Sequence, residues 1–328
     1  MAQPGKQILN FIITILIFLL PACDAPRDNP LDPDNPSNKL YIISGKLITA
    51  EKTSKPIGGA TFNWRNENVL GLTSADGTFK IQCASPANGW LLFEKSGFSS
   101  DSFYVDWKNE KAVNVSQSIN ALPVLDSLRI YSVVRNKYST NELLLYFEAS
   151  VTDIDDDIDT VKISCPDLSI NINLTKINSD YFEAKFTDYE LNINNFNDII
   201  GKSFYIIAIT SDGKSFNIGN SNVKRIIRDE ILIISPINSD TLETRTPELN
   251  WTRFTPGFSF NYTIEIFTDE PEPVLLWKKE NISSDEILIQ VETPIASTPS
   301  NDKFFWVIWC IDEFNNRSRS KPAGFILK

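Results

Sequence analysis

Short runs of Ile, Val, Phe, Tyr and Thr, separated by turn residues, recur along the chain from residue 40 to its end. Their spacing is about 8–14 residues, which is typical of an all-β chain. No part of residues 40–328 carries the sustained apolar period of a long helix. The steps Asp76-Gly77 and Asp212-Gly213 supply the positive φ that tight hairpin turns require. The sequence therefore predicts an all-β fold made of consecutive β-sandwiches.

Three segments of similar length divide this part of the chain, and each is long enough for one sandwich domain. We expect the domains to be 39–122, 123–229 and 230–328. Residues 23–38 are rich in Pro, Asp and Asn, so they are expected to form a semi-rigid spacer. The strand candidates of the middle segment are Ser127–Val134, Leu143–Val151, Thr160–Cys165, Tyr181–Phe186, Ser203–Thr210 and Phe216–Ile226.

The first residues have the layout of a secretory signal. A basic start precedes the short apolar run Phe11–Leu20, and the small residue Ala22 stands before Cys23. A membrane-spanning helix needs about 18–20 apolar residues, and this run ends at Pro21. The ending resembles the lipobox of bacterial lipoproteins, except that Pro21 stands where a small residue is usual. The resemblance implies a signal peptide over 1–22 and a mature chain that begins at Cys23 with acyl chains such as palmitate.

The charge of the chain agrees with attachment to a membrane through acyl chains. Its 42 acidic and 31 basic residues give a formal net charge of -11, which makes nucleic acid an unsuitable partner. An acidic protein is also not held flat on an anionic membrane by charge, so we expect the acyl chains on Cys23 to hold it there. The expected location is the bacterial cell envelope, at the outer rather than the inner membrane.

Two features of the composition limit the kinds of catalytic site, metal site and disulfide that the chain can form. The chain has no histidine, which excludes Ser-His-Asp and Cys-His catalysis and every histidine-bearing metal site. Besides Cys23 it has one cysteine in each expected domain, Cys83, Cys165 and Cys310. No domain can therefore close an internal disulfide, and we interpret these three cysteines as small buried apolar residues.

Residues 39–122 resemble the carboxypeptidase-regulatory-like, transthyretin-like β-sandwich. That family has Gly-x-Val, Pro-Ile-x-Gly-Ala-x-Val, Thr-x-x-Asp-Gly-x-Phe and Gly-Tyr or Gly-Phe in this order. The resemblance implies a non-catalytic accessory module of the kind common in bacterial envelope proteins. The matching positions are Gly45, Pro56, Gly59, Ala60, Thr73, Asp76, Gly77, Phe79, Gly97 and Phe98.

The other two segments resemble further sandwich families. Residues 123–229 look like a bacterial immunoglobulin-like domain. Residues 230–328 resemble a bacterial fibronectin type III domain, because Trp251 ends an early strand and the aromatic run Phe304–Asp312 precedes an Asn-rich turn. This resemblance implies that Trp251 and Trp306 are core residues.

The densest charge in the sequence is the run Asp-Ile-Asp-Asp-Asp-Ile-Asp over residues 153–159. Asp153, Asp155 and Asp157 have alternate spacing, and clustered carboxylates can supply several of the six to eight oxygen ligands of calcium. The run is not an EF-hand loop. The alternative is a solvated acidic turn without metal. Catalysis by these carboxylates is not expected, because neighbouring side chains on one turn do not define a cleft.

One late strand is apolar on both faces. Phe305, Val307 and Trp309 alternate with Phe304, Trp306 and Ile308, so both faces are expected to be covered. The cover over Phe305, Val307 and Trp309 is the second domain (residues 123–229), a partner protein or the flat face of a sugar. Trp90 and Trp107 are further glycan candidates, for which core burial is the alternative.

These features predict a non-catalytic, membrane-anchored lipoprotein that serves in binding, adhesion or scaffolding. Two alternatives remain open: a carbohydrate-binding accessory lipoprotein for polymer uptake, and a non-catalytic subunit of an envelope enzyme or transporter complex. No cofactor is expected apart from a structural calcium ion at Asp153, Asp155 and Asp157. The expected partner is an envelope protein or a polysaccharide.

Overall fold

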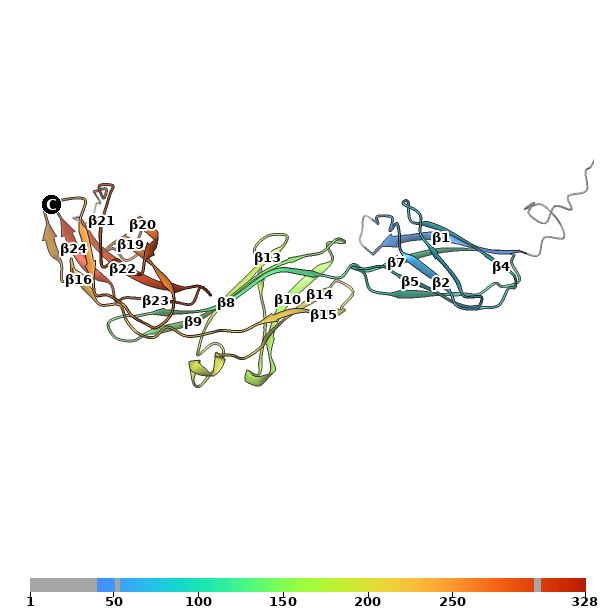
Figure 1. Cartoon of the computed structure of the whole chain (residues 1–328), viewed down its shortest axis with the longest axis horizontal. Coiled ribbons are helices and arrows are strands. Elements are labelled where there is room, and N and C mark those ends of the chain that lie inside the picture. The colour runs from blue at the N-terminus through green and yellow to red at the C-terminus, as the bar shows by residue number, and fades with distance from the viewer. Residues whose placement is uncertain (1–39, 51–53, 298–301) are drawn as a thin grey trace, which may run out of the picture. The chain divides into compact units, whose positions relative to one another are not determined.

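The computed structural model describes residues 40–50, 54–297 and 302–328. The chain divides into two compact units, unit 1 up to Ala121 and unit 2 from Leu122 to Lys328. Strands make up nearly all the regular structure of the described residues, which confirms the all-β prediction (Figure 1). The predicted signal peptide, Cys23 and the spacer lie outside the described residues.

Unit 1 is a sandwich of two sheets around one core, with strand orders β4-β1-β7 and β3-β2-β5-β6. Alternation explains how β4 packs, because Phe79, Ile81 and Cys83 are buried while the residues between them are exposed. Phe79 contacts Phe62 and Phe93 of the other sheet, with ring centroids 5.5 and 5.3 Å apart. The strands are β1 (Tyr41–Thr49), β2 (Thr61–Trp64), β3 (Val69–Leu72), β4 (Thr78–Cys83), β5 (Gly89–Glu94), β6 (Asp101–Val105) and β7 (Ala112–Ile119).

For three residues of the predicted motif, the structure of unit 1 shows why that residue type is needed at that position. Gly45 lies against β7, where an added Cβ would meet the carbonyl oxygen of Val115 at 1.9 Å. Gly77 has a φ of 77° in the turn before β4, as an Asp-Gly hairpin turn requires. The buried Thr73 hydroxyl donates to the Ile57 carbonyl at 2.6 Å and accepts from the Ala60 amide at 2.9 Å. The assignment of this unit to the carboxypeptidase-regulatory-like family stays a prediction.

Unit 2 begins with two sheets that enclose one core. A four-stranded sheet has the order β11-β10-β14-β15, and it faces the β12-β13-β9-β8 end of a longer sheet. The strands are β8 (Val124–Arg135), β9 (Glu142–Thr152), β10 (Ile158–Cys165), β11 (Ile170–Asn173), β12 (Thr175–Lys176), β13 (Tyr181–Thr187), β14 (Phe204–Thr210) and β15 (Ser215–Ser221), and the 3-10 turns are η1 (Pro166–Leu168) and η2 (Phe196–Ile199). Among the described residues, none of the helices has the length and apolar character needed to cross a membrane.

A second core of unit 2 lies between the sheet β16-β18-β21 and the other end of the longer sheet, where β19, β20, β22 and β24 pair. Trp251 and Trp306 are fully buried in it, as predicted, and the indole of Trp306 donates to the Pro236 carbonyl at 2.9 Å. The strands are β16 (Ile233–Ser235), β17 (Asp240–Leu242), β18 (Glu248–Trp251), β19 (Phe260–Thr268), β20 (Leu275–Ser283), β21 (Leu288–Gln290), β22 (Lys303–Asp312), β23 (Arg317–Arg319) and β24 (Ala323–Leu327).

One long strand joins the two cores of unit 2. β8 pairs with β9 along its length, and its last residues also pair in parallel with β23, with Val133 opposite Arg317. The longer sheet therefore continues from one core to the other without an edge between them. The predicted boundary between 123–229 and 230–328 falls inside this compact unit, and the three-domain division stays a prediction.

Candidate functional site

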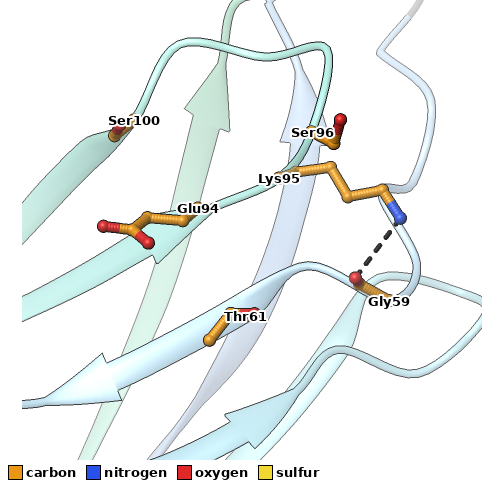
Figure 2. Close-up of a pocket in the computed structure, with 6 residues that line it drawn as sticks. All are labelled: Gly59, Thr61, Glu94, Lys95, Ser96 and Ser100. Carbon is orange, nitrogen blue, oxygen red and sulfur yellow. Dashed lines mark hydrogen bonds between the residues drawn. The ribbon is translucent and has the colours of Figure 1, made fainter.

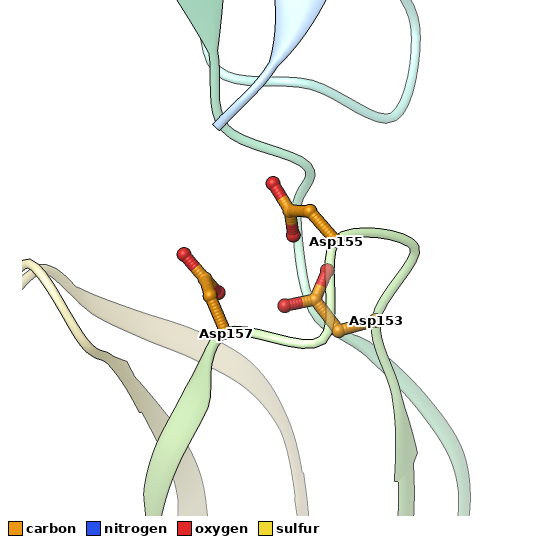
Figure 3. Close-up of side chains that lie close together, drawn as sticks. All are labelled: Asp153, Asp155 and Asp157. Carbon is orange, nitrogen blue, oxygen red and sulfur yellow. The ribbon is translucent and has the colours of Figure 1, made fainter. Parts of the chain in front are cut away.

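The three aspartates predicted to bind calcium lie on the connection from β9 to β10, and their carboxylates converge (Figure 3). One oxygen from each of Asp153, Asp155 and Asp157 lies within 4.8 Å of the other two. Asp155 is only 2% exposed. Asp156 has a φ of 49° and is exposed. Its side chain therefore points outward, whereas the side chains of Asp155 and Asp157 point toward the cluster. The structure thus brings together all three predicted ligands.

Placing these carboxylates together is costly. Two unit charges about 4–5 Å apart repel by about 3–4 kcal/mol at an effective dielectric constant of about 20. Burial, aided by the adjacent Asp157 and Asp155 carboxyl groups, raises the pKa of Asp153 to about 8. Burial also raises the pKa of Asp157. A bound cation or proton would offset this repulsion.

The predicted patch on β22 is covered from within unit 2. Val307 is fully buried and therefore cannot meet a partner. Trp309 packs against a cluster made by β8 and β9, and its indole donates to Glu265 at 2.8 Å. Phe305 stacks on Phe267, with ring centroids 5.3 Å apart. The cluster against which Trp309 packs consists of Tyr131, Val133 and Leu144, and Tyr146 packs against the same cluster.

Of the two glycan candidates in unit 1, only Trp90 reaches the surface. Trp107 is buried, and its indole donates to the Ala87 carbonyl at 3.1 Å. Trp90 is 50% exposed and meets Tyr104, itself 48% exposed, at a centroid distance of 5.1 Å. The two residues are paired neighbours on β5 and β6.

Exposed leucines lie on the same face of this sheet as the aromatic pair. Leu70 and Leu72 of β3 are each 67% exposed. In the register of the sheet, Asn63 stands between Leu70 and Leu92, so these side chains share the outer surface with Trp90. We call this surface the outer sheet face; its residues are Leu70, Leu72, Trp90, Leu92 and Tyr104. The sequence analysis missed its leucines, although their apolar character at alternate positions of β3 was the available signal.

Polar side chains border one end of the outer sheet face. A shallow hollow of about 390 Å³ is lined by Arg65, Trp90, Leu92, Ser100, Asp101 and Ser102. An aromatic ring beside hydroxyl, guanidinium and carboxylate groups is a combination that can bind an apolar surface that also carries hydroxyl groups.

A second hollow of unit 1, of about 580 Å³, is lined by Gly59, Thr61, Glu94, Lys95, Ser96 and Ser100 (Figure 2). The Lys95 ammonium donates to the Gly58 and Gly59 carbonyls at 3.1 and 3.3 Å, so its donors are engaged by backbone. Glu94 points away from Lys95 in this view. Glu94 is the register partner of Thr61 on the neighbouring strand.

Comparison with known proteins gives only distant likenesses. No protein-family model matches the chain, and no curated protein sequence matches it. The fibronectin(III)-like modules of CbhA from Clostridium thermocellum align with 63% of this chain and 93% of theirs, at 12% identity and a TM-score of 0.28. The major pilin subunit BcpA of Bacillus cereus aligns with 88% of this chain and 96% of its own, at 10% identity and a TM-score of 0.28. The FN1–FN3 domains of chicken CNTN1 align with 84% and 92%, at 8% identity and a TM-score of 0.33.

Likenesses at this level do not define a function. The β-sandwich architecture rests on the sheets and cores of this chain itself.

Proposed function

We propose that this chain is a non-catalytic binding protein, anchored to the bacterial outer membrane through acyl chains on Cys23, that serves in adhesion, display or scaffolding. The observation that carries the binding role is the outer sheet face, because exposed apolar side chains gathered on one face of a sheet commonly mark contacts. The absence of histidine and the engagement of Lys95 by backbone carbonyls support a role without catalysis.

The anchor is tested in cells that make the protein. Wild-type protein should incorporate a palmitate label and fractionate with outer-membrane vesicles, whereas the Cys23→Ser variant should lose the label and leave the membrane fraction. Cys83→Ala is the matched control, because it removes a buried thiol of unit 1 and should leave the anchor intact. Membrane retention and labelling of Cys23→Ser would show that the anchor is wrong.

The binding role is tested by mild cross-linking of the lipidated protein in its own envelope. A Leu70→Ser, Leu72→Ser variant removes two exposed apolar side chains without entering the core. We expect it to lose partners that wild-type protein captures. Capture of one stoichiometric enzyme or transporter would favour the role of a complex subunit. An unchanged set of partners would contradict binding through the outer sheet face.

The carbohydrate-binding alternative is favoured by one specific observation, the exposed Trp90–Tyr104 pair beside the polar hollow. The probes are xylan, laminarin and starch in affinity electrophoresis. A glycan ligand should retard the wild-type protein, and Trp90→Ala should weaken binding by about tenfold, which is about 1.4 kcal/mol. Tyr189→Ala is the control, because it removes another exposed aromatic ring, in unit 2. Equal loss in both variants, or no retardation by any probe, would count against this alternative.

A further inference from the structure

A hollow of about 410 Å³ lies in unit 2 where the short strand β12 ends beside β13. β12 pairs with β13 only at Phe182 and Glu183, whereas β13 continues beyond that point along β9. Among the described residues, no strand pairs with the β12 side of the rest of β13. Main-chain groups of an antiparallel strand alternate between its two sides, and on this side the Tyr181 carbonyl accepts from the Ile177 amide. The N–H and C=O of Lys185, which lines the hollow and lies an even number of residues further on, therefore face it.

The aromatic wall of this hollow is the ring of Tyr146 on β9, which the neighbouring strand holds in place. Tyr146 stacks on Tyr131 of β8, with ring centroids 5.2 Å apart and planes 10° from parallel. Tyr131 is 6% exposed, and the Arg317 guanidinium lies over its ring at 4.9 Å from the centroid. The Tyr131 hydroxyl donates at 2.6 Å to Glu148, which also lines the hollow. Side chains fixed in this way lose little freedom when a ligand binds, so this wall is preformed.

The charges of the lining cancel. Arg129 pairs with Glu148 at 2.7 Å. The other two charged residues of the lining, Glu183 and Lys185, have opposite signs and lie at alternate positions on the same face of β13. A hollow without net charge favours a neutral ligand over a metal ion, a phosphate or a carboxylate.

Hydrogen-bonding groups that are free to meet a ligand converge on the hollow. Within the described part of the chain, four polar side chains of its lining have no hydrogen bond or ion pair: Asn173, Thr175, Glu183 and Lys185. Together they offer donors and acceptors. Ile177, which is 53% exposed, adds apolar surface beside them. A sugar ring matches this combination, because its hydroxyl groups donate and accept while its C–H face packs on an aromatic ring.

We infer that this hollow binds a neutral sugar unit of a polysaccharide, with the sugar ring against Tyr146 and its hydroxyl groups on Glu183 and Asn173. The inference rests on the proposed binding role of the chain. It does not depend on the outer sheet face, which belongs to unit 1, so Trp90→Ala should leave this binding unchanged.

The test uses the full-length protein and the neutral trisaccharides xylotriose, laminaritriose and maltotriose as probes. Isothermal titration calorimetry should show that at least one of them binds with a Kd of about 1 mM or tighter. The same probe should slow hydrogen exchange of the Thr175 and Lys185 amides. Trigalacturonate and the deacetylated chitosan trimer, which carry negative and positive charge, should bind at least about tenfold more weakly.

Two variants identify the binding residues. Glu183→Ala and Asn173→Ala remove side chains without partners among the described residues, so each should leave the fold intact and weaken binding by about five- to tenfold. Glu272→Ala is the matched control, because it removes another exposed glutamate of unit 2, between β19 and β20, and should leave binding unchanged.

Three results would overturn the inference: no neutral probe binds, a charged probe binds more tightly than every neutral one, or Glu183→Ala and Asn173→Ala bind as the wild type does. Loss of binding in Trp90→Ala alone would assign the sugar to unit 1 instead. Failure of the proposed function is a separate result, because it is read from the partners captured by the Leu70→Ser, Leu72→Ser variant.

Discussion

The three cysteine thiols of the described residues each lie in a different hydrophobic core. Cys83 lies in the core of unit 1, and Cys165 and Cys310 lie in the two cores of unit 2. Burial raises the pKa of Cys83 to about 11 and that of Cys310 to about 12. The thiolate is the reactive form, so these sulfurs are inert while the protein is folded. The interpretation of all three as small buried apolar residues is confirmed.

This burial gives a prediction at the residue scale. A Cys23→Ser variant of the full chain, folded and at pH 8, should show no thiol that reacts within minutes with a disulfide reagent. In guanidinium chloride the three remaining cysteines should all react. Absorbance of the released thiolate measures both. Fast reaction of one thiol in the folded variant would mean that its core opens readily, against the packing described here.

At the scale of elements, one buried amide holds β23 against β8. Asn316, the residue before β23, is fully buried, and its side-chain oxygen accepts from the Ser132 amide at 3.0 Å and the Ser132 hydroxyl at 3.2 Å. Its amide nitrogen donates to Asp312 at 3.1 Å. Satisfied buried networks of this kind fix one arrangement of neighbouring strands.

Replacement of Asn316 by alanine should therefore destabilise unit 2 by about 2–4 kcal/mol, because the buried Ser132 amide loses its acceptor and Asp312 loses one of its donors. Denaturant titration followed by tryptophan fluorescence measures the change. Asn220→Ala, at an exposed position of β15, should change stability by less than about 0.5 kcal/mol. Equal effects of the two substitutions would show that the Asn316 network adds no specific stability.

The strands themselves could largely be predicted from period-two patterns. Ser127–Val134 lies inside β8 and Leu143–Val151 lies inside β9. The candidate Phe216–Ile226 extends beyond β15, because Val223 and Ile226 pack in the first core of unit 2 after the strand has ended, which keeps the apolar pattern going. The short edge strands β11 and β12 were missed, because they present too few residues for a pattern.

The pairing of strands that are far apart in the chain could not be predicted from the sequence. The parallel contact of β8 with β23 brings together Ser132 and Asn316, which are 184 residues apart, and neither local pattern specifies the other. For the same reason, the sequence did not show which residues pack against Trp309. The three aspartates could be found because their spacing is local, whereas the inward turn that buries Asp155 depends on the surrounding fold.

At the scale of the whole molecule, the continuous sheet of unit 2 has a consequence for unfolding. The strand β8 supplies Ile130 to the first core, and its Val133 belongs to a separate cluster against which Trp309 of β22 packs. The middle of β8 is buried on both faces, with Ser132 fully inaccessible. Opening either core would disturb the pairing of β8 with β23 and the packing of Trp309 against the cluster of Val133, so the cores are expected to unfold together.

Hydrogen exchange of the full chain tests this coupling. Amides of β14 in the first core and of β19 in the second should exchange through openings of the same free energy, with the same dependence on denaturant. Asn316→Ala should lower both by the same amount, because it weakens the junction that they share, while protection of β1 and β4 in unit 1 should not change. If the first core exchanges at lower free energy than the second, and Asn316→Ala affects only one, then residues 122–229 and 230–328 unfold as separate domains despite the common sheet.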